Sequence, residues 1–316
     1  MSAMAAATST NTIEDLHHDL LTGILCLLDP PTLAIAGCAT SHLRALADQP
    51  QLWEDLCFSS WPSLRHPRLL HLLRSSPGSF RSFFADAHTF PNPTAARASA
   101  CDCDGAPPAL LVSAVDLFHG GKPVMSRVVE TDAHGPWFLC SPFCVDVMDA
   151  KDPPPSYIVS PGELTLSWVV FDPARRRAVN LSSQRPVSVE RQWYTGEILI
   201  RFAAVLDGGR TAATALVTCD EETMRMREIS LTMENMDGTC LNGKESLAIL
   251  RGALEGERKG RGEAGVAEAR RRYAEYVTNK EERKERRQKR EGRLDMVCIV
   301  LGVSLFLGLL ASVALR

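Results

Sequence analysis

The sequence predicts an α+β, multi-domain chain: N-terminal helices, a β-rich, sandwich-like middle domain, a charged helical stalk and a C-terminal transmembrane helix. Three observations support this prediction. Apolar residues recur at helical spacing in the first 90 residues, short β-branched or alternating segments follow, and the twenty residues before Arg316 carry no charge. With 316 residues and a hydrophobic fraction of 45%, the chain can hold at least one sizeable core.

Shifts in composition divide the chain into segments. The first residues are small and polar, which predicts disorder, and Thr12 is a plausible cap for the first helix. Pro91-Asn92-Pro93 opens a linker. The predicted segments are 1–11 disordered, 12–58 and 59–90 helical, 91–108 linker, 109–243 β-rich, 244–293 charged helical stalk and 294–316 membrane anchor.

The middle segment contains runs that are typical of strands. Residues 164–171 (LTLSWVVF) lie between Pro161-Gly162 and Asp172-Pro173, and residues 197–206 end at the turn signal Asp207-Gly208-Gly209. Further strands are expected at 109–118, 137–148, 211–219 and 224–233. Several short strands separated by Gly and Pro turns favour an antiparallel sandwich or barrel.

The C-terminal apolar segment predicts a tail anchor. Twenty uncharged residues, 296–315, would span roughly 30 Å as a helix, the thickness of the hydrocarbon core. The preceding stalk holds 16 Lys and Arg against 10 Asp and Glu, which keeps this flank cytosolic by the positive-inside rule. We therefore expect a single-pass protein, anchored through residues 294–315 with its N-terminal bulk in the cytosol. Arg316 alone after the segment points toward the endoplasmic reticulum.

Residues 13–33 read IEDLHHDLLTGILCLLDPPTL, and Leu52-Trp53 follows downstream. This pattern resembles the F-box, a three-helix module, with matches at Ile24-Leu25, Leu28-x-Pro30, Leu33 and Leu52-Trp53. His17 departs from the family, which has proline there. Over its whole length the chain is similar to plant F-box proteins with a C-terminal membrane segment. The similar stretches are residues 77–86, 137–143, 166–168 and 180–187.

The resemblance implies a non-catalytic subunit that recognises substrates for an SCF-type ubiquitin ligase. Its apolar face would bind a Skp1-like adaptor and through it a cullin, while the β-rich domain recruits an unknown protein target. Trp53 would pack inside the module. The residues implied at the adaptor surface are Leu16, Leu20, Ile24, Leu25, Leu28, Pro30 and Leu33.

Two alternatives stay open. The apolar residues could instead form the core of an independent helical domain. The whole protein could be a membrane-anchored, non-catalytic binding module for a carbohydrate, a lipid headgroup or a protein, without ligase function; a basic flank would favour anionic lipid. Association with a cullin distinguishes a ligase subunit from such a module.

Exposed residues that could recruit a target are few. Arg175-Arg176-Arg177, Arg185 and Arg191 could bind an acidic or phosphorylated segment, and Trp193 could join them. The alternative is a solvated turn after Asp172-Pro173. Trp137 and Trp168 are expected to be core anchors.

Other chemistries find no support in the sequence. A net charge of −3 argues against a nucleic-acid-binding protein. The ten cysteines follow no secretory signal, which predicts free thiols, and they lack the paired spacing of a zinc site. The sequence contains no GxSxG, HExxH or GxxxxGK[ST] pattern, so we expect no catalytic site, metal or cofactor.

Overall fold

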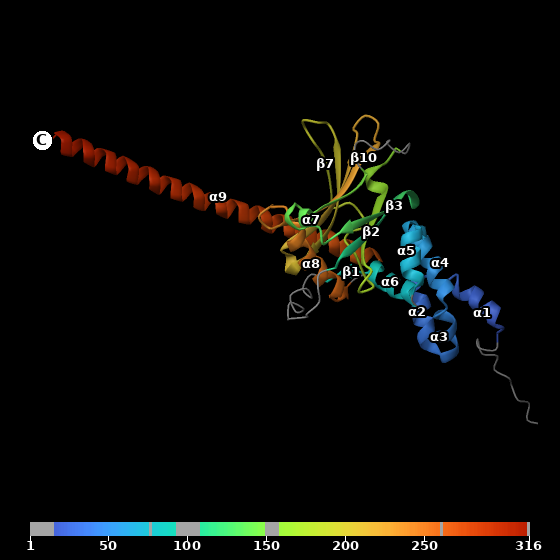
Figure 1. Cartoon of the computed structure of the whole chain (residues 1–316). Coiled ribbons are helices and arrows are strands. Elements are labelled where there is room, and N and C mark those ends of the chain that lie inside the picture. Colours follow the sequence, from blue (N-terminus) through green and yellow to red (C-terminus); the bar gives the residue numbers. More distant parts are fainter. Residues whose placement is uncertain (1–15, 76–77, 93–107, 149–157, 260–261, 315–316) are drawn as a thin grey trace, which may run out of the picture.

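The computed structural model describes residues 16–75, 78–92, 108–148, 158–259 and 262–314 (Figure 1). The expected cap Thr12, the stretch 1–11 and most of the expected linker lie outside the described residues. The fold is α+β, with two larger antiparallel sheets and helices at both ends of the chain. Helices α1 to α3 form one extremity of the molecule, and the long α9 projects from the opposite side (Figure 1).

Helices α1 to α6, with η2, make up what we call the helical module. Their starts follow from capping and from proline at the first helical position. Asp29 caps α2, whose first residue is Pro30, and Thr40 caps α3. The elements are α1 (His18–Leu25), α2 (Pro30–Ala39), α3 (Ser41–Ala47), α4 (Pro50–Ser60), η2 (Pro62–Arg65), α5 (Pro67–Arg74) and α6 (Ser79–His88).

Two sheets form the sandwich. The first has the strand order β3-β2-β5-β6, and its strands are β2 (Leu110–His119), β3 (Lys122–Asp132), β5 (Leu164–Asp172) and β6 (Arg177–Asn180). The second has the order β4-β10-β9-β8-β7, and its strands are β4 (Cys144–Met148), β7 (Ser188–Arg191), β8 (Ile198–Leu206), β9 (Thr211–Cys219) and β10 (Met226–Asn235). The remaining elements are β1 (Phe90–Pro91), α7 (Pro136–Cys140), η4 (Pro161–Glu163), η5 (Asp207–Gly209), α8 (Gly243–Glu255), β11 (Arg258–Lys259) and α9 (Gly262–Ala314).

The inner faces of the two sheets share one core. Trp168 from the first sheet and Phe202 from the second are fully buried in it, because successive side chains along a strand point to opposite faces. Helix α8 closes this core with Leu247, Leu250 and Leu254.

The other side of the first sheet, which points away from the second sheet, is also buried, under the helical module. Val112 and Ala114 of β2 pack into the same cluster as Trp61 and Phe83, whereas Val115 faces the sandwich. A strand buried on both faces has little polar sequence, which explains the nearly continuous apolar run LLVSAV that starts β2. The helical module and the first sheet are therefore joined by a shared hydrophobic core.

Some expectations differ from the structure in the middle segment. The expected strand at 137–148 begins as helix α7, with Pro136 at its first turn, and only Cys144–Met148 is a strand. Trp137 is 84% exposed, so its expected role as a core anchor is wrong, whereas that of Trp168 is confirmed. Strand β3 escaped prediction because its sequence, KPVMSRVVETD, is polar and largely exposed.

The segment 244–293 is not one solvated stalk. Its first part is α8, which belongs to the sandwich core. The first turns of α9 also pack on the sandwich, where buried Tyr276 joins Val205 and Ala212. Lys280 and Glu234, 2.9 Å apart, extend this contact.

The expected transmembrane helix at 296–315, and with it the single-pass localisation, is wrong. Within the described ranges, no helix combines the length and the apolar character that crossing a membrane requires. Helix α9 carries charged residues up to Asp295, and its uncharged run begins only at Met296. Arg293 and Asp295 lie immediately before it.

Candidate functional site

An apolar surface on the helical module is the first candidate site. Leu20 is 60% exposed, Ile24 44% and Leu27, in the turn after α1, 86%. Their spacing of i, i+4 and i+7 places them on one side of the helical turn. Ile35 on α2 is 71% exposed as well. We call these four residues the outer face.

The residues predicted to bind a partner do not share one environment. Leu16, Leu20 and Ile24 are exposed, and Leu28 and Pro30 are half-buried. Leu25 and Leu33 are buried in the core of the module, so they support the surface from below. Leu27 and Ile35 were missed. Helical spacing from Leu20 could have identified Leu27, but Ile35 lies in the apolar run LAIAG, where no polar residue marks the exposed side.

A rigid base lies beneath the outer face. Trp53 is buried, and its indole N–H donates a hydrogen bond to the carbonyl oxygen of Ala47 at 2.7 Å. Its ring makes an edge contact with Phe84, with 5.7 Å between centroids. Packing of Trp53 inside the module is therefore confirmed. The tryptophan connects α3 to α6 and so ties the first helices to the sheet side of the module.

Two buried polar contacts fix the module against β2 and β5. The indole N–H of Trp61 donates to Ser167 Oγ at 2.7 Å. The backbone N–H and the hydroxyl of Ser63 donate to the carboxylate of Asp116, at 2.9 Å and 2.6 Å. Asp116 is fully buried, and this burial raises the pKa of its carboxyl above the ordinary value. We call Trp61, Ser63, Asp116 and Ser167 the joint.

A second set of charges lies beside the joint. Asp86 of α6 accepts hydrogen bonds from the backbone of Ala178, at 3.1 Å, and forms an ion pair with Arg177, at 3.0 Å. Arg258 donates to the carbonyl oxygen of Ala178 at 2.6 Å. Burial lowers the pKa of Arg258 to about 10. These groups link α6, β6 and β11.

The arginines that could have recruited an acidic target face carboxylates of this chain instead. Arg175 lies 2.9 Å from Asp172 and 3.5 Å from Glu255. Arg191 pairs with Glu221 at 2.7 Å. A cluster of free guanidinium groups is therefore not present at 175–177, where each of the two outer arginines has a carboxylate partner.

Exposed aromatic side chains mark the turn between β7 and β8. Trp193 is 89% exposed, and its ring makes an edge contact with that of Tyr194, with 5.6 Å between centroids. Of the residues expected to recruit a target, Trp193 thus has a highly exposed side chain.

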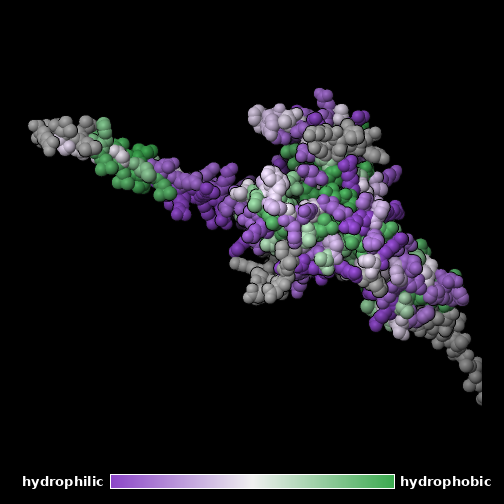
Figure 2. Space-filling view, in the orientation of Figure 1, coloured by the Kyte–Doolittle hydropathy of each residue, from purple (hydrophilic) through white to green (hydrophobic). Residues whose placement is uncertain are grey.

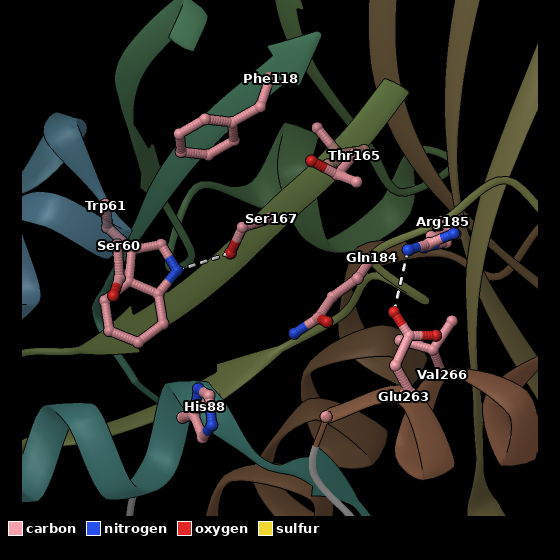
Figure 3. A pocket seen from close by; sticks show the side chains of 12 residues that line it. Ser60, Trp61, His88, Phe118, Thr165, Ser167, Gln184, Arg185, Glu263 and Val266 are labelled. Atoms are coloured by element: carbon pink, nitrogen blue, oxygen red, sulfur yellow. Dashed lines mark hydrogen bonds and ion pairs between the residues drawn. The ribbon is translucent and has the colours of Figure 1, made fainter. Parts of the chain in front are cut away.

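A pocket of about 380 Å³ opens where the helical module, the first sheet and α9 meet (Figure 3). Trp61 and Phe118 border it with their rings, and Gln184 extends toward its middle (Figure 3). Its lining residues are Ser60, Trp61, His88, Phe118, Thr165, Leu166, Ser167, Gln184, Arg185, Gly262, Glu263 and Val266. We call it the junction pocket.

Metal and thiol chemistry have little basis in the described part of the chain. No three His, Cys, Asp or Glu side chains converge there as metal ligands. Cys101 and Cys103 lie outside the described residues. Burial raises the pKa of the Cys219 thiol to about 12, and the pKa of Cys144 is raised as far, first by burial and then by Asp146. Neither is a thiolate near neutral pH.

The far part of α9 carries a second apolar surface. Figure 2 shows a hydrophilic stretch of this helix followed by a hydrophobic one. Ten large hydrophobic side chains there, from Leu294 to Leu307, are each more than half exposed.

Comparison with known proteins gives consistent matches. The chain is 35% identical to F-box protein At2g27310 of Arabidopsis thaliana, over 97% of either chain. It is 39% identical to Probable F-box protein At2g36090 of the same plant, over 94% of this chain and 92% of that one. F-box protein GID2 of Oryza sativa subsp. japonica is 35% identical over 74 residues, 23% of this chain and 35% of that protein. No protein-family profile matches the chain. No solved structure matches it either.

Proposed function

The chain belongs to a family of plant F-box proteins, and from this premise we propose that its outer face binds a Skp1-like adaptor, and through it a cullin. Proteins of this family are non-catalytic substrate adaptors of SCF-type ubiquitin ligases, so the chain is not itself an enzyme. The site residues proposed for the adaptor are the outer face, together with Leu16, Leu28 and Pro30. Leu25 and Leu33 support them from the core.

The outer face carries the proposal. Leu20, Ile24, Leu27 and Ile35 remain exposed although the helical module already has a hydrophobic core, which it shares with the first sheet. Covering an exposed Leu or Ile fully can contribute about 1.5–3 kcal/mol. A few central contacts usually dominate such an interface, and helix-borne apolar side chains suit a groove between partner helices.

The joint supports a mechanism based on proximity. The shared core and the buried contacts of Trp61 and Asp116 hold the helical module in a fixed orientation on the sandwich. A target bound to the sandwich would therefore stay at a set distance from the ligase subunits bound to the module. A rigid scaffold raises the effective concentration of the target lysine and adds no bond chemistry of its own.

For the target we propose the turn between β7 and β8. Trp193 and Tyr194 offer large, rigid apolar faces, the residue types that dominate protein interfaces. The rim is charged in both signs, with Arg191 and Glu221 paired at 2.7 Å. A protein segment with an apolar anchor fits this surface better than the acidic segment suggested by the arginine run.

The adaptor proposal is tested by purifying the full chain together with a recombinant plant Skp1-like protein. We expect Leu20→Asp/Ile24→Asp/Leu27→Asp to weaken the complex by about 100-fold or more, since each change removes an apolar contact and buries a charge. Trp137→Asp is the matched control: the tryptophan is also exposed, but α7 lies apart from α1 (Figure 1). Equal complex formation by both variants would contradict the proposal.

Cullin association separates this function from the alternative of a binding module without ligase activity. A ligase subunit assembles with adaptor and cullin together, and the triple variant loses both. Failure of the unaltered chain to retain either the adaptor or the cullin would favour the alternative.

A further inference from the structure

The junction pocket has the dimensions of a small-molecule site. Its volume of about 380 Å³ falls within the range of roughly 300–1,000 Å³ that is usual for such sites. Three parts of the chain that are far apart in sequence form its walls: Trp61 of the helical module, Phe118 and Thr165 of the first sheet, and Glu263 of α9 (Figure 3). Sites between structural units are common places for ligands.

One wall is an aromatic surface that cannot turn away. Trp61 is buried, its indole N–H is held by Ser167 Oγ at 2.7 Å, and its ring makes edge contacts with Phe83 and Phe84 at 5.6 Å and 5.2 Å. Phe118 borders the same hollow with its ring (Figure 3). Two aromatic rings, of which Trp61 is held in place, favour a flat ring as occupant.

Gln184 provides a polar group toward the same hollow. Its φ is 62°, a left-handed conformation that is uncommon outside glycine. Its carbonyl oxygen accepts a hydrogen bond from Leu166 at 2.9 Å, and its N–H donates to Ser182 Oγ at 3.1 Å, which hold it there. Its side-chain amide points into the pocket (Figure 3) and has no hydrogen-bond partner among the described residues. A strained residue that presents an unused amide to a cavity is typical of a binding site.

A charged pair closes the rim of the pocket. Arg185 donates to the carboxylate of Glu263 at 2.9 Å. Both side chains reach solvent, so the pair is only weakly stabilising and can exchange partners. A guanidinium pairs best with a planar carboxylate, and Glu263 already occupies that position.

From this arrangement we propose that the junction pocket binds a small planar carboxylic acid. The flat ring lies against Trp61 and Phe118, and a polar ring atom meets the amide of Gln184. The ligand carboxylate binds Arg185 in place of that of Glu263.

Titration of the full chain with quinoline-3-carboxylate, followed by calorimetry, tests the carboxylate part. Glu263→Gln should strengthen binding about two- to fivefold, the factor that corresponds to releasing an exposed ion pair. Arg185→Gln should weaken it about tenfold, and the uncharged quinoline-3-carboxamide should bind the unaltered chain about as weakly. Glu221→Gln, which removes the same charge from an exposed pair at 2.7 Å elsewhere, is the matched control and should change nothing.

Gln184→Gly tests the pocket itself, because a misfolded variant cannot imitate the expected result. Glycine adopts a positive φ readily, so this variant should raise the midpoint of thermal unfolding. It should also weaken the binding of quinoline-3-carboxylate several-fold, since the side-chain amide is removed. The proposal is overturned if neither the unaltered chain nor Glu263→Gln binds the acid at about 5 mM. It is also overturned if all variants bind it equally.

Discussion

The outer face and the joint lie on two sides of the helical module and differ in whether their side chains have partners within this chain. On the outer face, Leu27 and Ile35 are exposed apolar side chains. At the joint, Asp116 is a fully buried charge-bearing group, and Ser63 donates two hydrogen bonds to it. A partner protein can bury apolar area on the outer face, which would stabilise the complex. At the joint the polar groups already have their hydrogen-bond partners, so a partner protein would add nothing there. The hydrogen bonds of the joint are complete within this chain, and they fix the orientation of the helical module on the sandwich.

The largest effect on stability should come from two residues of α2 that are two positions apart. Leu33 is fully buried, whereas Ile35 is 71% exposed. Leu33→Ala should lower the free energy of unfolding by about 2–5 kcal/mol, because it leaves a cavity. Ile35→Ala should change it by less than about 0.5 kcal/mol. Urea unfolding of both variants measures the difference, and equal losses would remove the distinction between core and outer face.

A smaller effect is expected at the joint. Asp116→Ala leaves the N–H and the hydroxyl of Ser63 without their acceptor in a buried place. Such a loss costs about 1–3 kcal/mol. Ser59→Ala is a control in the same module, where the exposed hydroxyl donates to the carbonyl oxygen of Leu56 within α4. If both substitutions lower the free energy of unfolding equally, the buried hydrogen bonds of Asp116 do not contribute to the attachment of the module.

The pH dependence of stability sharpens this prediction. Burial raises the pKa of Asp116 above its ordinary 3.8, so the folded chain holds this proton more tightly than the unfolded chain. The group therefore stabilises the fold most below about pH 3.8, and this contribution is lost as pH rises through the raised pKa. Asp116→Asn should remove that slope. Denaturant titrations of both proteins from about pH 4 to pH 8 measure it, and parallel curves would contradict it.

Much of this architecture could be predicted from the sequence, and the failures have physical causes. Local signals predicted β5 and a helical N-terminal region: a β-branched run between turn residues, and apolar residues at helical spacing. The joint could not be predicted, because Ser63 and Asp116 meet only through tertiary packing across 53 positions. Exposure likewise depends on neighbours: Leu25 and Ile24 are adjacent in sequence, yet the first is core and the second is surface. The apolar composition of 296–315 also predicted a transmembrane helix, but no helix among the described residues is long and apolar enough to cross a membrane.

The smallest effect should come from α9, where the hydroxyl of Tyr276 is one of the groups that attach the helix to the sandwich. Tyr276 is buried, and its O–H donates to the carbonyl oxygen of Asn235 at 2.9 Å. Burial raises the pKa of Tyr276 above its ordinary value, so the phenol stays a donor at neutral pH. Tyr276→Phe keeps the ring among Val205 and Ala212 and loses this bond together with the longer one, 3.3 Å, to the carbonyl oxygen of Glu234, at a cost of about 0.5–1.5 kcal/mol. Hydrogen exchange should report faster opening of the first turns of α9, with the helical module unaffected. Faster exchange in α1 and α2 as well would contradict this prediction. It would mean that α9 and the helical module unfold as one unit, although the joint attaches the module to the sandwich independently of α9.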